Sequence, residues 1–471
     1  MARSGRRREK PVSVRPRSRG RDWIHLPSVV RRSRGWSPAV VLALAFGALI
    51  AIGTVLLALP IARSEGGWTP FTVALFTATG AASGALVLVD TGTHWTLFGQ
   101  VVILVLIQAG GLGIMTGSTL LLLLAGRQAT LRERILIGEA LGERGLGTVV
   151  QLARRILLMT AAIELVGAML LAARFATETS LPQALWWGVF HSISAFNNAG
   201  YDVFGDFRSL THYNQDVWVM GVFAVLIVLG GLGYTVLADL HRTRGWTRLT
   251  LDTKLVVATS IPLLVGGALL VFALERGNLA TLGAMSLPTQ LLNAGFHSVT
   301  ARTAGFNSFD VGGMTEAALV TTIALMFIGG ASGSAGGGIK VNTFSVLFFA
   351  IVSALRGSER VEAFRRQIPA SLVLRAVSIA LLAIALIYAV TVVLAASERQ
   401  SFVALAFEVT SAFSSVGLST GIVPSLSESG KLLLIVTMYV GRLGPLTVAL
   451  ALANRVEARR YQWAEEPVKV G

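Results

Sequence analysis

Glycine residues at the ends of short apolar segments are the residues of this sequence that could help to coordinate an ion. Three segments are related: FHSISAFNNAGYDVF around Gly200, FHSVTARTAGFNSFD around Gly305 and FEVTSAFSSVGLSTGI around Gly417. A fourth, weaker copy, FTATGAASGALVLVDT, ends near Gly84 or Ala85. A dehydrated cation needs close oxygen ligands, and backbone carbonyls supply them when several strands approach one axis. Four such strands from one chain therefore predict a cation-coordinating pore.

Glycine suits these strands because its backbone can aim successive carbonyls at the axis and no side chain blocks the ion. The alternative is that the glycines only allow close packing of helices, as in the GxxxG motif. A single glycine would favour that alternative. Three related copies, each between a short and a long apolar segment, favour the pore.

The composition of the chain places these strands in a membrane. Of the 471 residues, 53% are hydrophobic and 14% are charged, and the mean hydropathy is +0.68. These values exclude a soluble globular domain. Cysteine is absent, which excludes disulfides and cysteine metal sites. The formal net charge of +15 would suggest nucleic acid for a soluble chain, but the basic residues gather between apolar runs, so no nucleic-acid partner is expected.

The apolar segments predict an all-α polytopic membrane protein. Eight segments are long enough to cross roughly 30 Å of hydrocarbon. They cover about residues 37–60, 96–124, 152–173, 216–240, 254–274, 315–351, 371–396 and 431–453. Four segments too short to span lie within the pairs, at about 71–80, 183–195, 287–300 and 402–413. This order predicts four covalently linked helix–pore-helix–helix repeats, with eight transmembrane helices and four re-entrant half-helices around one pore.

Positive charge predicts the orientation of the chain. Basic residues fill both tails and the segments between repeats, whereas the opposite loops carry acids such as Asp90, Asp202 and Asp310. Because cytoplasmic loops are enriched in Lys and Arg, both termini are expected in the cytoplasm. The basic N-terminal tail is too long for the start of a cleaved signal peptide. The expected units are a tail at 1–36, pore repeats at 37–125, 126–241, 242–355 and 356–454, and a tail at 455–471.

Two features interrupt the apolar spans. Six of the ten residues 329–338 are glycine, and each costs roughly 1 kcal/mol against alanine in a helix, so this stretch cannot stay helical. Its sequence superficially resembles a phosphate-binding loop, but no Lys-Ser or Lys-Thr pair follows the last glycine. Arg442 lies well inside the last span, where a charge costs about 3 kcal/mol. We expect it to face the pore or a partner charge rather than to snorkel to the interface.

The motifs SAFNNAGY, TARTAGFNSFD, SAFSSVGL and VDTGTHWTLFGQ resemble those of the Trk/Ktr/HKT superfamily of potassium transporters, and most closely the membrane subunit of the bacterial Ktr uptake system. The resemblance runs from about residue 37 to residue 453. It implies potassium as the transported ion and a plasma-membrane homodimer with one pore per subunit. It also implies a selectivity filter formed by Gly84, Asn198, Ala199, Gly200, Thr303, Ala304, Gly305, Ser415, Val416 and Gly417, with K⁺ at the carbonyls of the four glycines.

The first repeat departs from the pattern of this superfamily. It reads Ser83-Gly84-Ala85-Leu86 and is one residue short, so counting back from Asp90 selects Ala85 whereas matching glycine to glycine selects Gly84. In plant relatives, a residue other than glycine here accompanies sodium permeation. A sodium-permeable member of the superfamily is therefore the alternative function, with Na⁺ as the alternative ion.

The resemblance assigns the glycine-rich stretch to an intramembrane loop that gates the pore. The implied gate consists of Gly329, Gly330, Ala331, Ser332, Gly333, Ser334, Ala335, Gly336, Gly337, Gly338, Lys340 and Arg442. The implied partners are membrane lipids and a KtrA/TrkA-like cytosolic ring that binds nucleotides and regulates the pore. No catalytic constellation is visible, so neither enzyme activity nor a covalently bound cofactor is expected. A membrane scaffold would need no filter, and the fourfold glycine pattern argues against it.

Other polar residues are expected to stabilise the structure. His191 and His297 occupy matching sites in the second and third short segments, with Glu408 in the fourth. Hydrogen bonding is their expected role, rather than metal ligation. Glu164 lies inside the third span, and the sequence indicates no partner for it. Asp202 is the best candidate to draw cations towards the mouth of the pore.

Overall fold

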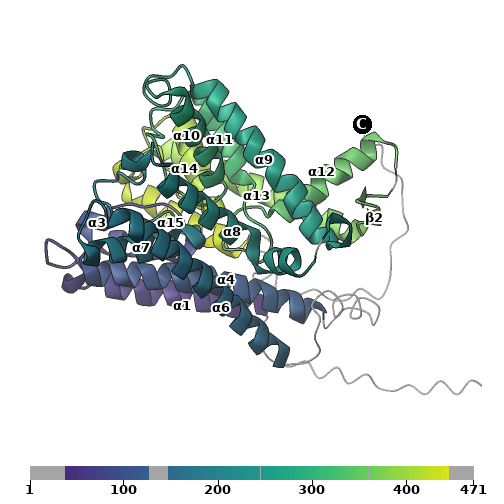
Figure 1. Cartoon of the computed structure of the whole chain (residues 1–471), viewed down its shortest axis with the longest axis horizontal. Coiled ribbons are helices and arrows are strands. Elements are labelled where there is room, and N and C mark those ends of the chain that lie inside the picture. The colour runs from purple at the N-terminus through teal and green to yellow at the C-terminus, as the bar shows by residue number, and fades with distance from the viewer. Residues whose placement is uncertain (1–37, 127–146, 244, 359, 445–471) are drawn as a thin grey trace, which may run out of the picture. The chain divides into compact units, whose positions relative to one another are not determined.

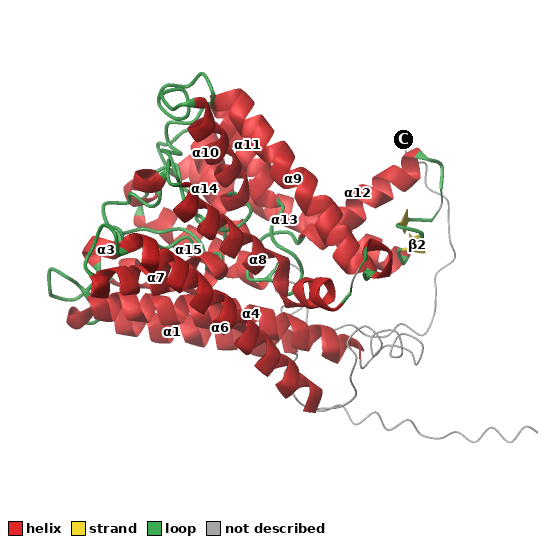
Figure 2. Cartoon of the chain, viewed as in Figure 1, coloured by secondary structure: helices red, strands yellow, loops and turns green. Residues whose placement is uncertain are grey.

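The computed structural model describes residues 38–126, 147–243, 245–358 and 360–444, which are mostly helical (Figures 1 and 2). The predicted tails at 1–36 and 455–471 and the basic segment 127–146 lie outside the described residues. The described strands form one small antiparallel hairpin, β1 (Glu362–Ala363) and β2 (Arg366–Gln367).

A long helix, a short helix and a further helix follow one another four times along the chain. The first group contains α1 (Pro38–Ala58), α2 (Phe71–Ser83) and α4 (Leu97–Gly126), and the second contains α6 (Gly147–Phe175), α7 (Leu181–Phe196) and α8 (Val217–Arg242). The third contains α9 (Leu251–Glu275), α10 (Leu287–Thr300), α11 (Glu316–Phe327) and α12 (Val341–Leu355), and the fourth α13 (Ala370–Ser397), α14 (Phe402–Ser414) and α15 (Glu428–Leu443). Single turns connect them: α3 (Thr91–His94), η1 (Pro60–Ala62), η2 (Thr211–Tyr213), η3 (Trp246–Arg248) and η4 (Val423–Ser425).

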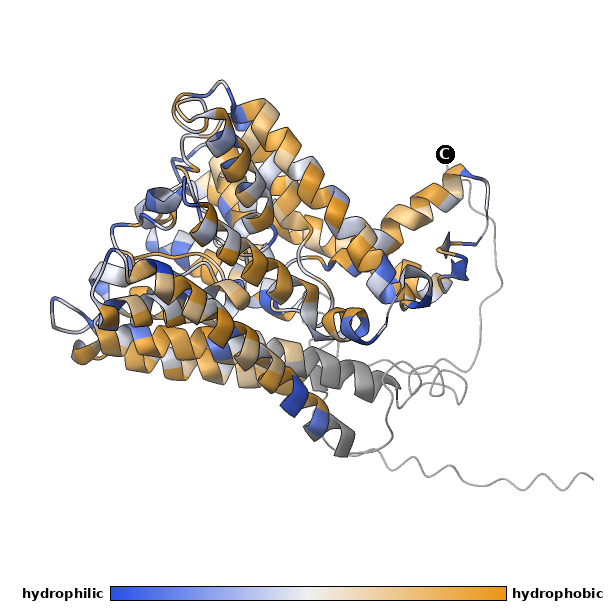
Figure 3. Cartoon of the chain, in the orientation of Figure 1, coloured by the Kyte–Doolittle hydropathy of each residue, from blue (hydrophilic) through white to orange (hydrophobic). Residues whose placement is uncertain are grey.

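Five helices in the described part of the chain are long and apolar enough to cross a membrane. They are Val40–Ala58, Gln151–Phe175, Val217–Arg242, Leu251–Glu275 and Ala370–Ser397. Large apolar side chains stay exposed along them, such as Ile52, Leu269 and Leu381. Figure 3 shows that the helices are rich in hydrophobic residues. Exposed apolar surface of this extent is stable against lipid rather than water. The chain is therefore an integral membrane protein.

The predicted span at 315–351 is broken in the structure. Helix α11 ends at Phe327 and α12 begins at Val341, and the segment between them is not helical. Ile328 and Ile339 at its two ends pair as an isolated parallel bridge. The break coincides with the run of glycines, which lowers helix propensity enough to end α11.

The short helices run from an exposed start to a buried end. Their first residues, Phe71, Leu181, Leu287 and Phe402, are exposed, whereas in α14 every residue from Phe407 to Ser414 is buried. Proline stands in the first turn of α7 and of α10, where an N–H group would have no helical partner. The sequence therefore starts these helices at the surface and ends them inside the protein.

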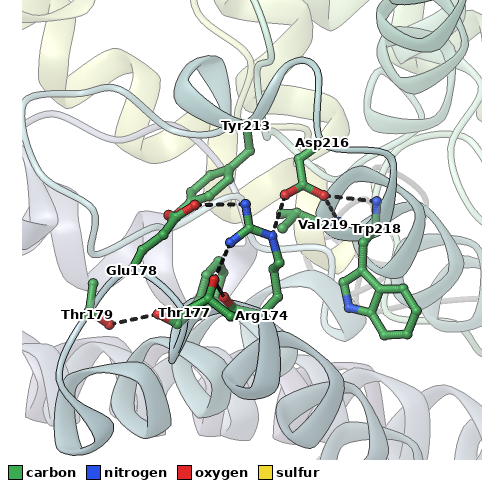
Figure 4. Close-up of polar contacts among 9 residues, drawn as sticks. Arg174, Thr177, Glu178, Thr179, Tyr213, Asp216, Trp218 and Val219 are labelled. Atoms are coloured by element: carbon green, nitrogen blue, oxygen red, sulfur yellow. Dashed lines mark hydrogen bonds and ion pairs between the residues drawn. The ribbon is translucent and has the colours of Figure 1, made fainter.

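Polar contacts tie the end of one long helix to the start of the next. The Arg174 guanidinium at the end of α6 donates to Asp216 Oδ2 at 2.7 Å, and Asp216 caps α8 (Figure 4). The Glu275 carboxylate at the end of α9 accepts from the N–H and Oγ1 of Thr315, the cap of α11, at 2.9 and 2.7 Å. Each tie closes a helix pair around the short helix between them.

Candidate functional site

Each short helix is followed by a residue with left-handed backbone conformation. These residues are Gly84 (φ 66°), Asn198 (φ 52°), Thr303 (φ 84°) and Ser415 (φ 52°). The next residue donates its N–H back into the short helix, at 2.9 Å in all four cases: Ala85 to Gly80, Ala199 to Ser194, Ala304 to Thr300 and Val416 to Ser411. The shared geometry makes the four left-handed residues structurally equivalent.

The strands that follow form a closed ring. Gly200, Gly305 and Gly417 also have positive φ, at 74°, 81° and 93°. A Cβ atom on each would meet a carbonyl oxygen of the next strand: Gly200 that of Ala304 at 2.7 Å, Gly305 that of Val416 at 2.5 Å and Gly417 that of Ala85 at 3.2 Å. The fourth strand thus contacts the first. Larger residues at these glycines would push the strands apart.

The first strand is offset in this ring. Gly84 lies at the position of Asn198, Thr303 and Ser415, so the position of Gly200 is taken by Leu86. Helix packing shows the same offset. A Cβ on a glycine of the following helix would overlap a carbonyl oxygen at the end of the short helix: Gly110 that of Ala82, Gly230 that of Phe196 and Gly441 that of Phe413. These carbonyls lie three residues before Ala85, Ala199 and Val416.

The glycine-rich segment 329–338 packs against the inner ends of the strands. A Cβ on Gly336 would lie 2.6 Å from Thr303 Oγ1, and one on Gly337 would lie 2.5 Å from the carbonyl oxygen of Ser414. Backbone hydrogen bonds join the segment to α8, where Gly233 interrupts the helix with φ 76°. Ala331 donates to Gly231 at 2.8 Å and Ala335 to Gly230 at 3.2 Å. The segment therefore lies between the strands and α8, and a shift of the segment would change contacts of both.

Three cationic side chains hold carbonyl groups of this segment. Arg442 Nη1 donates to Ala335 O at 2.6 Å, and Lys340 Nζ donates to Gly336 O. Arg302 Nη2 donates to Gly329 O at 3.1 Å. Within the described ranges, none of the three forms an ion pair with a carboxylate. Sequence reasoning missed Arg302, although an arginine inside an apolar segment is itself a functional signal.

Glu164 finds its partners in the structure. Its carboxylate accepts from Gln108 Nε2 and from Asn197 Nδ2, both at 2.9 Å, and Asn197 Nδ2 also donates to Gln108 Oε1 at 2.6 Å. Asn197 directly precedes the left-handed residue of the second strand. The partners lie on α4 and after α7, far from Glu164 in the sequence, so no local pattern could identify them.

The polar residues of the short helices form structural hydrogen bonds. His191 Nε2 accepts from Val203 N at 3.2 Å, and His297 Nε2 lies 3.1 Å from Thr322 Oγ1. Glu408 Oε1 accepts from Thr420 N at 2.7 Å. Each contact links a short helix either to the chain beyond its own strand or to the following helix.

Comparison with known proteins agrees with the resemblance seen in the sequence. The family model TrkH, described as cation transport protein, matches residues 38–462. The Ktr system potassium uptake protein B of Bacillus subtilis is 39% identical over 429 residues, which cover 90% of this chain and 95% of that protein. The protein of the same name from Vibrio alginolyticus is 39% identical over 443 residues, covering 93% and 96%.

Two further similarities bear on the ion and on the fold. The potassium/sodium uptake protein NtpJ of Enterococcus hirae is 38% identical over 443 residues, covering 92% of this chain and 97% of that protein. The crystal structure of the potassium transporter TrkH from Vibrio parahaemolyticus aligns with a TM-score of 0.70 over 90% of this chain and 86% of that one. Its 17% identity makes it a likeness of fold.

Proposed function

Because this chain belongs to the TrkH family of cation transport proteins, we propose that it carries potassium ions into the cell through a pore lined by its four strands. Its curated relatives are named as potassium uptake proteins and match over nearly their whole length. The ring in which each strand contacts a carbonyl of the next is the observation that carries the proposal. Converging carbonyls can replace the hydration shell of an ion.

The proposed filter has two successive levels of carbonyl groups. The first level consists of Ala85, Ala199, Ala304 and Val416, since three of their oxygens adjoin the neighbouring glycines. The second consists of Gly200, Gly305 and Gly417, and the first strand has Leu86 there instead of glycine. K⁺ would bind along the axis at both levels, and Gly84 would support the first strand from below.

The proposed topology has eight transmembrane helices and four re-entrant half-helices, with both termini in the cytoplasm. Among the described residues, each predicted segment contains a helix, with the span 315–351 divided between α11 and α12, and the short helices end in the interior. A homodimer with one pore per subunit is proposed from the resemblance to the superfamily.

The proposed gate is the segment 329–338 together with Lys340 and Arg442. Its contacts with Thr303 and Ser414 support a position directly below the filter. Control by a KtrA/TrkA-like cytosolic ring is proposed because two of the relatives are named as protein B of a Ktr system. Such a regulator can shift the gate only if it binds its two arrangements with different affinities.

A potassium transporter that also admits sodium is the second candidate function. Leu86 breaks the glycine pattern of the second filter level, and one relative is named as a potassium/sodium uptake protein. The Leu86 carbonyl accepts a hydrogen bond from the Tyr201 hydroxyl at 3.3 Å, so it would contribute less to an ion at that level. A filter with fewer converging carbonyls at one level is expected to discriminate less between the two ions.

Ion-replacement flux in liposomes tests the filter. Replacing Gly200 or Gly417 by Ser should raise the ratio of sodium to potassium flux severalfold, because a side chain there meets the neighbouring carbonyl. Gly221→Ser and Gly295→Ser are matched controls, since nothing lies within 4 Å of a Cβ at either position. A flux ratio that both filter substitutions leave unchanged would show that these strands do not form the filter.

A further inference from the structure

The residue just before the left-handed position differs between the four strands. These residues are Ser83, Asn197, Arg302 and Ser414. Ser83 Oγ donates within its own helix, to Thr79 O at 2.6 Å, and the Ser414 hydroxyl has no hydrogen-bond partner in the described parts of the chain. Among the described residues, only the side chains of Asn197 and Arg302 form hydrogen bonds with other elements, and these elements differ.

Asn197 joins the second strand to helices α4 and α6 by hydrogen bonds. Its amide donates to Glu164 on α6 and to Gln108 on α4, at 2.9 and 2.6 Å. Glu164 is only 7% exposed, and Gln108 also donates to it. Among the described residues, no hydrogen bond joins this network to segment 329–338, so movement of that segment would break none of its hydrogen bonds.

Arg302 instead joins the third strand to the proposed gate. Its guanidinium donates to Gly329 O at 3.1 Å and to Ser260 O on α9 at 3.5 Å. The side chain is 9% exposed, and its Nε has no partner in the described residues. A buried charge that loses a hydrogen-bond partner is strongly destabilised. Movement of Gly329 would therefore act directly on Arg302.

The neighbouring residue can respond to such a change. Thr303 is β-branched and has φ 84°, a conformation that L-residues adopt only when their surroundings hold them there. Its side chain also adjoins Gly336 of the same segment. Arg302 and Thr303 thus place the strained turn of the third strand in contact with both ends of the segment.

We propose that Arg302 couples the segment 329–338 to the third filter strand, so that ion discrimination changes when the gate moves. The proposal rests on the filter and gate of the proposed function. Arg302 is a positioning residue in this proposal, because it would act on the filter through the backbone of Thr303.

A double-mutant cycle on flux tests the coupling. Arg302→Gln should change the ratio of sodium to potassium flux about fivefold in the intact protein, and by less than about twofold once Gly336, Gly337 and Gly338 are deleted. The deletion itself should open the pore. Asn197→Ser is the matched control and should change the ratio by the same factor in both backgrounds. If Arg302→Gln changes the ratio of sodium to potassium flux by the same factor in the intact protein and in the protein that lacks Gly336, Gly337 and Gly338, the proposal is wrong.

A second measurement applies if the shortened protein does not fold. Cysteine is absent from the sequence, so Ser332→Cys places a single partly buried thiol in the segment. Arg302→Gln should raise the rate at which a methanethiosulfonate reagent modifies this thiol, whereas Arg302→Lys and Asn197→Ser should not. An unchanged rate in Arg302→Gln refutes the coupling. A flux ratio that Gly305→Ser leaves unchanged would instead refute the filter itself, whatever Arg302 does.

Discussion

Asp202 follows the second strand of the proposed filter and lies near a second carboxylate, Asp90. Asp90 is held by the chain around it: its Oδ1 accepts from Thr93 N at 2.7 Å and its Oδ2 from Phe207 N at 2.6 Å. Asp202 Oδ1 accepts only a 3.2 Å bond from Phe204 N among the described residues. Burial, and then the nearby Asp90, raise the pKa of Asp202 to about 7.

Cation uptake should therefore depend on external pH through Asp202. Above pH 7 its carboxylate is charged and attracts cations to the mouth, and this attraction is lost as the pH falls through 7. We expect the KM for potassium to rise about twofold to fivefold between pH 8 and pH 6. Asp202→Asn should hold the higher KM at both values. If the KM for potassium still depends on pH in Asp202→Asn, another titrating group must cause that dependence.

The raised pKa of Asp202 also predicts that the stability of the protein changes with pH. A rise in pH should strengthen the attraction of cations by Asp202 but lower its contribution to stability. Because the folded-state pKa of Asp202 lies above the ordinary value of 3.8, the folded state holds its proton more tightly than the unfolded state. The contribution of Asp202 to the free energy of unfolding therefore falls as the pH rises from about 4 to about 7.

At the scale of elements, segment 329–338 is an irregular stretch between two helices. Its backbone is held by carbonyls of α8 and by the side chains of Arg302, Lys340 and Arg442. Irregular backbone at membrane depth is stable only where protein or a water-filled cavity satisfies its polar groups. Removing one of these donors should make the segment easier to displace.

Arg442→Ala should raise the maximal potassium flux or the basal leak severalfold. The substitution removes the bond to Ala335 O and a fixed positive charge that repels passing cations. Arg442→Lys keeps the charge and should stay near the unaltered rate. Lys254→Met is a control for the loss of a buried cation, since Lys254 Nζ donates to Thr247 O at 3.0 Å, which lies outside segment 329–338. Equal flux in Arg442→Ala and the unaltered protein, at equal expression, would leave Arg442 a structural role only.

At the scale of the whole molecule, the ring closes only because the fourth strand reaches the first. Gly417 adjoins the Ala85 carbonyl, and these residues come from opposite ends of the described chain. This contact is the widest of the three: a Cβ on Gly417 would lie 3.2 Å from the neighbouring carbonyl oxygen, against 2.5 Å for Gly305 and 2.7 Å for Gly200. In the proposed filter, the first strand is also the one with Leu86 at the second level, and the Leu86 carbonyl accepts from the Tyr201 hydroxyl at 3.3 Å.

Leu86→Gly should improve discrimination against sodium, because it restores glycine to the second level in all four strands. We expect the ratio of sodium to potassium flux to fall about threefold. The substitution also removes a fully buried side chain, which should lower the unfolding free energy by about 3 kcal/mol. Leu88→Ala removes apolar volume from the same cluster and should lower stability without changing the ratio. An equal ratio in Leu86→Gly and the unaltered protein would place the selective level elsewhere.

The sequence by itself determined the features that depend on local composition. Lengths of apolar runs predicted where helices lie, and the predicted segments agree with the observed helices to within a few residues at most described ends. The glycine run predicted the break between Phe327 and Val341, because helix propensity is a property of neighbouring residues. The motifs around Gly200, Gly305 and Gly417 identified the family, since they are contiguous in the chain.

Only the tertiary structure decided which distant residues meet. Gly84 and Ala85 were open alternatives for the first strand, and the structure adds that Gly84 shares the left-handed conformation of Asn198, Thr303 and Ser415 while the N–H of Ala85 donates to Gly80 O. Glu164 meets Gln108 and Asn197 across gaps of 56 and 33 residues. Hydrogen bonds between side chains need atoms within about 3 Å, and chain spacing sets no such distance for residues on different helices.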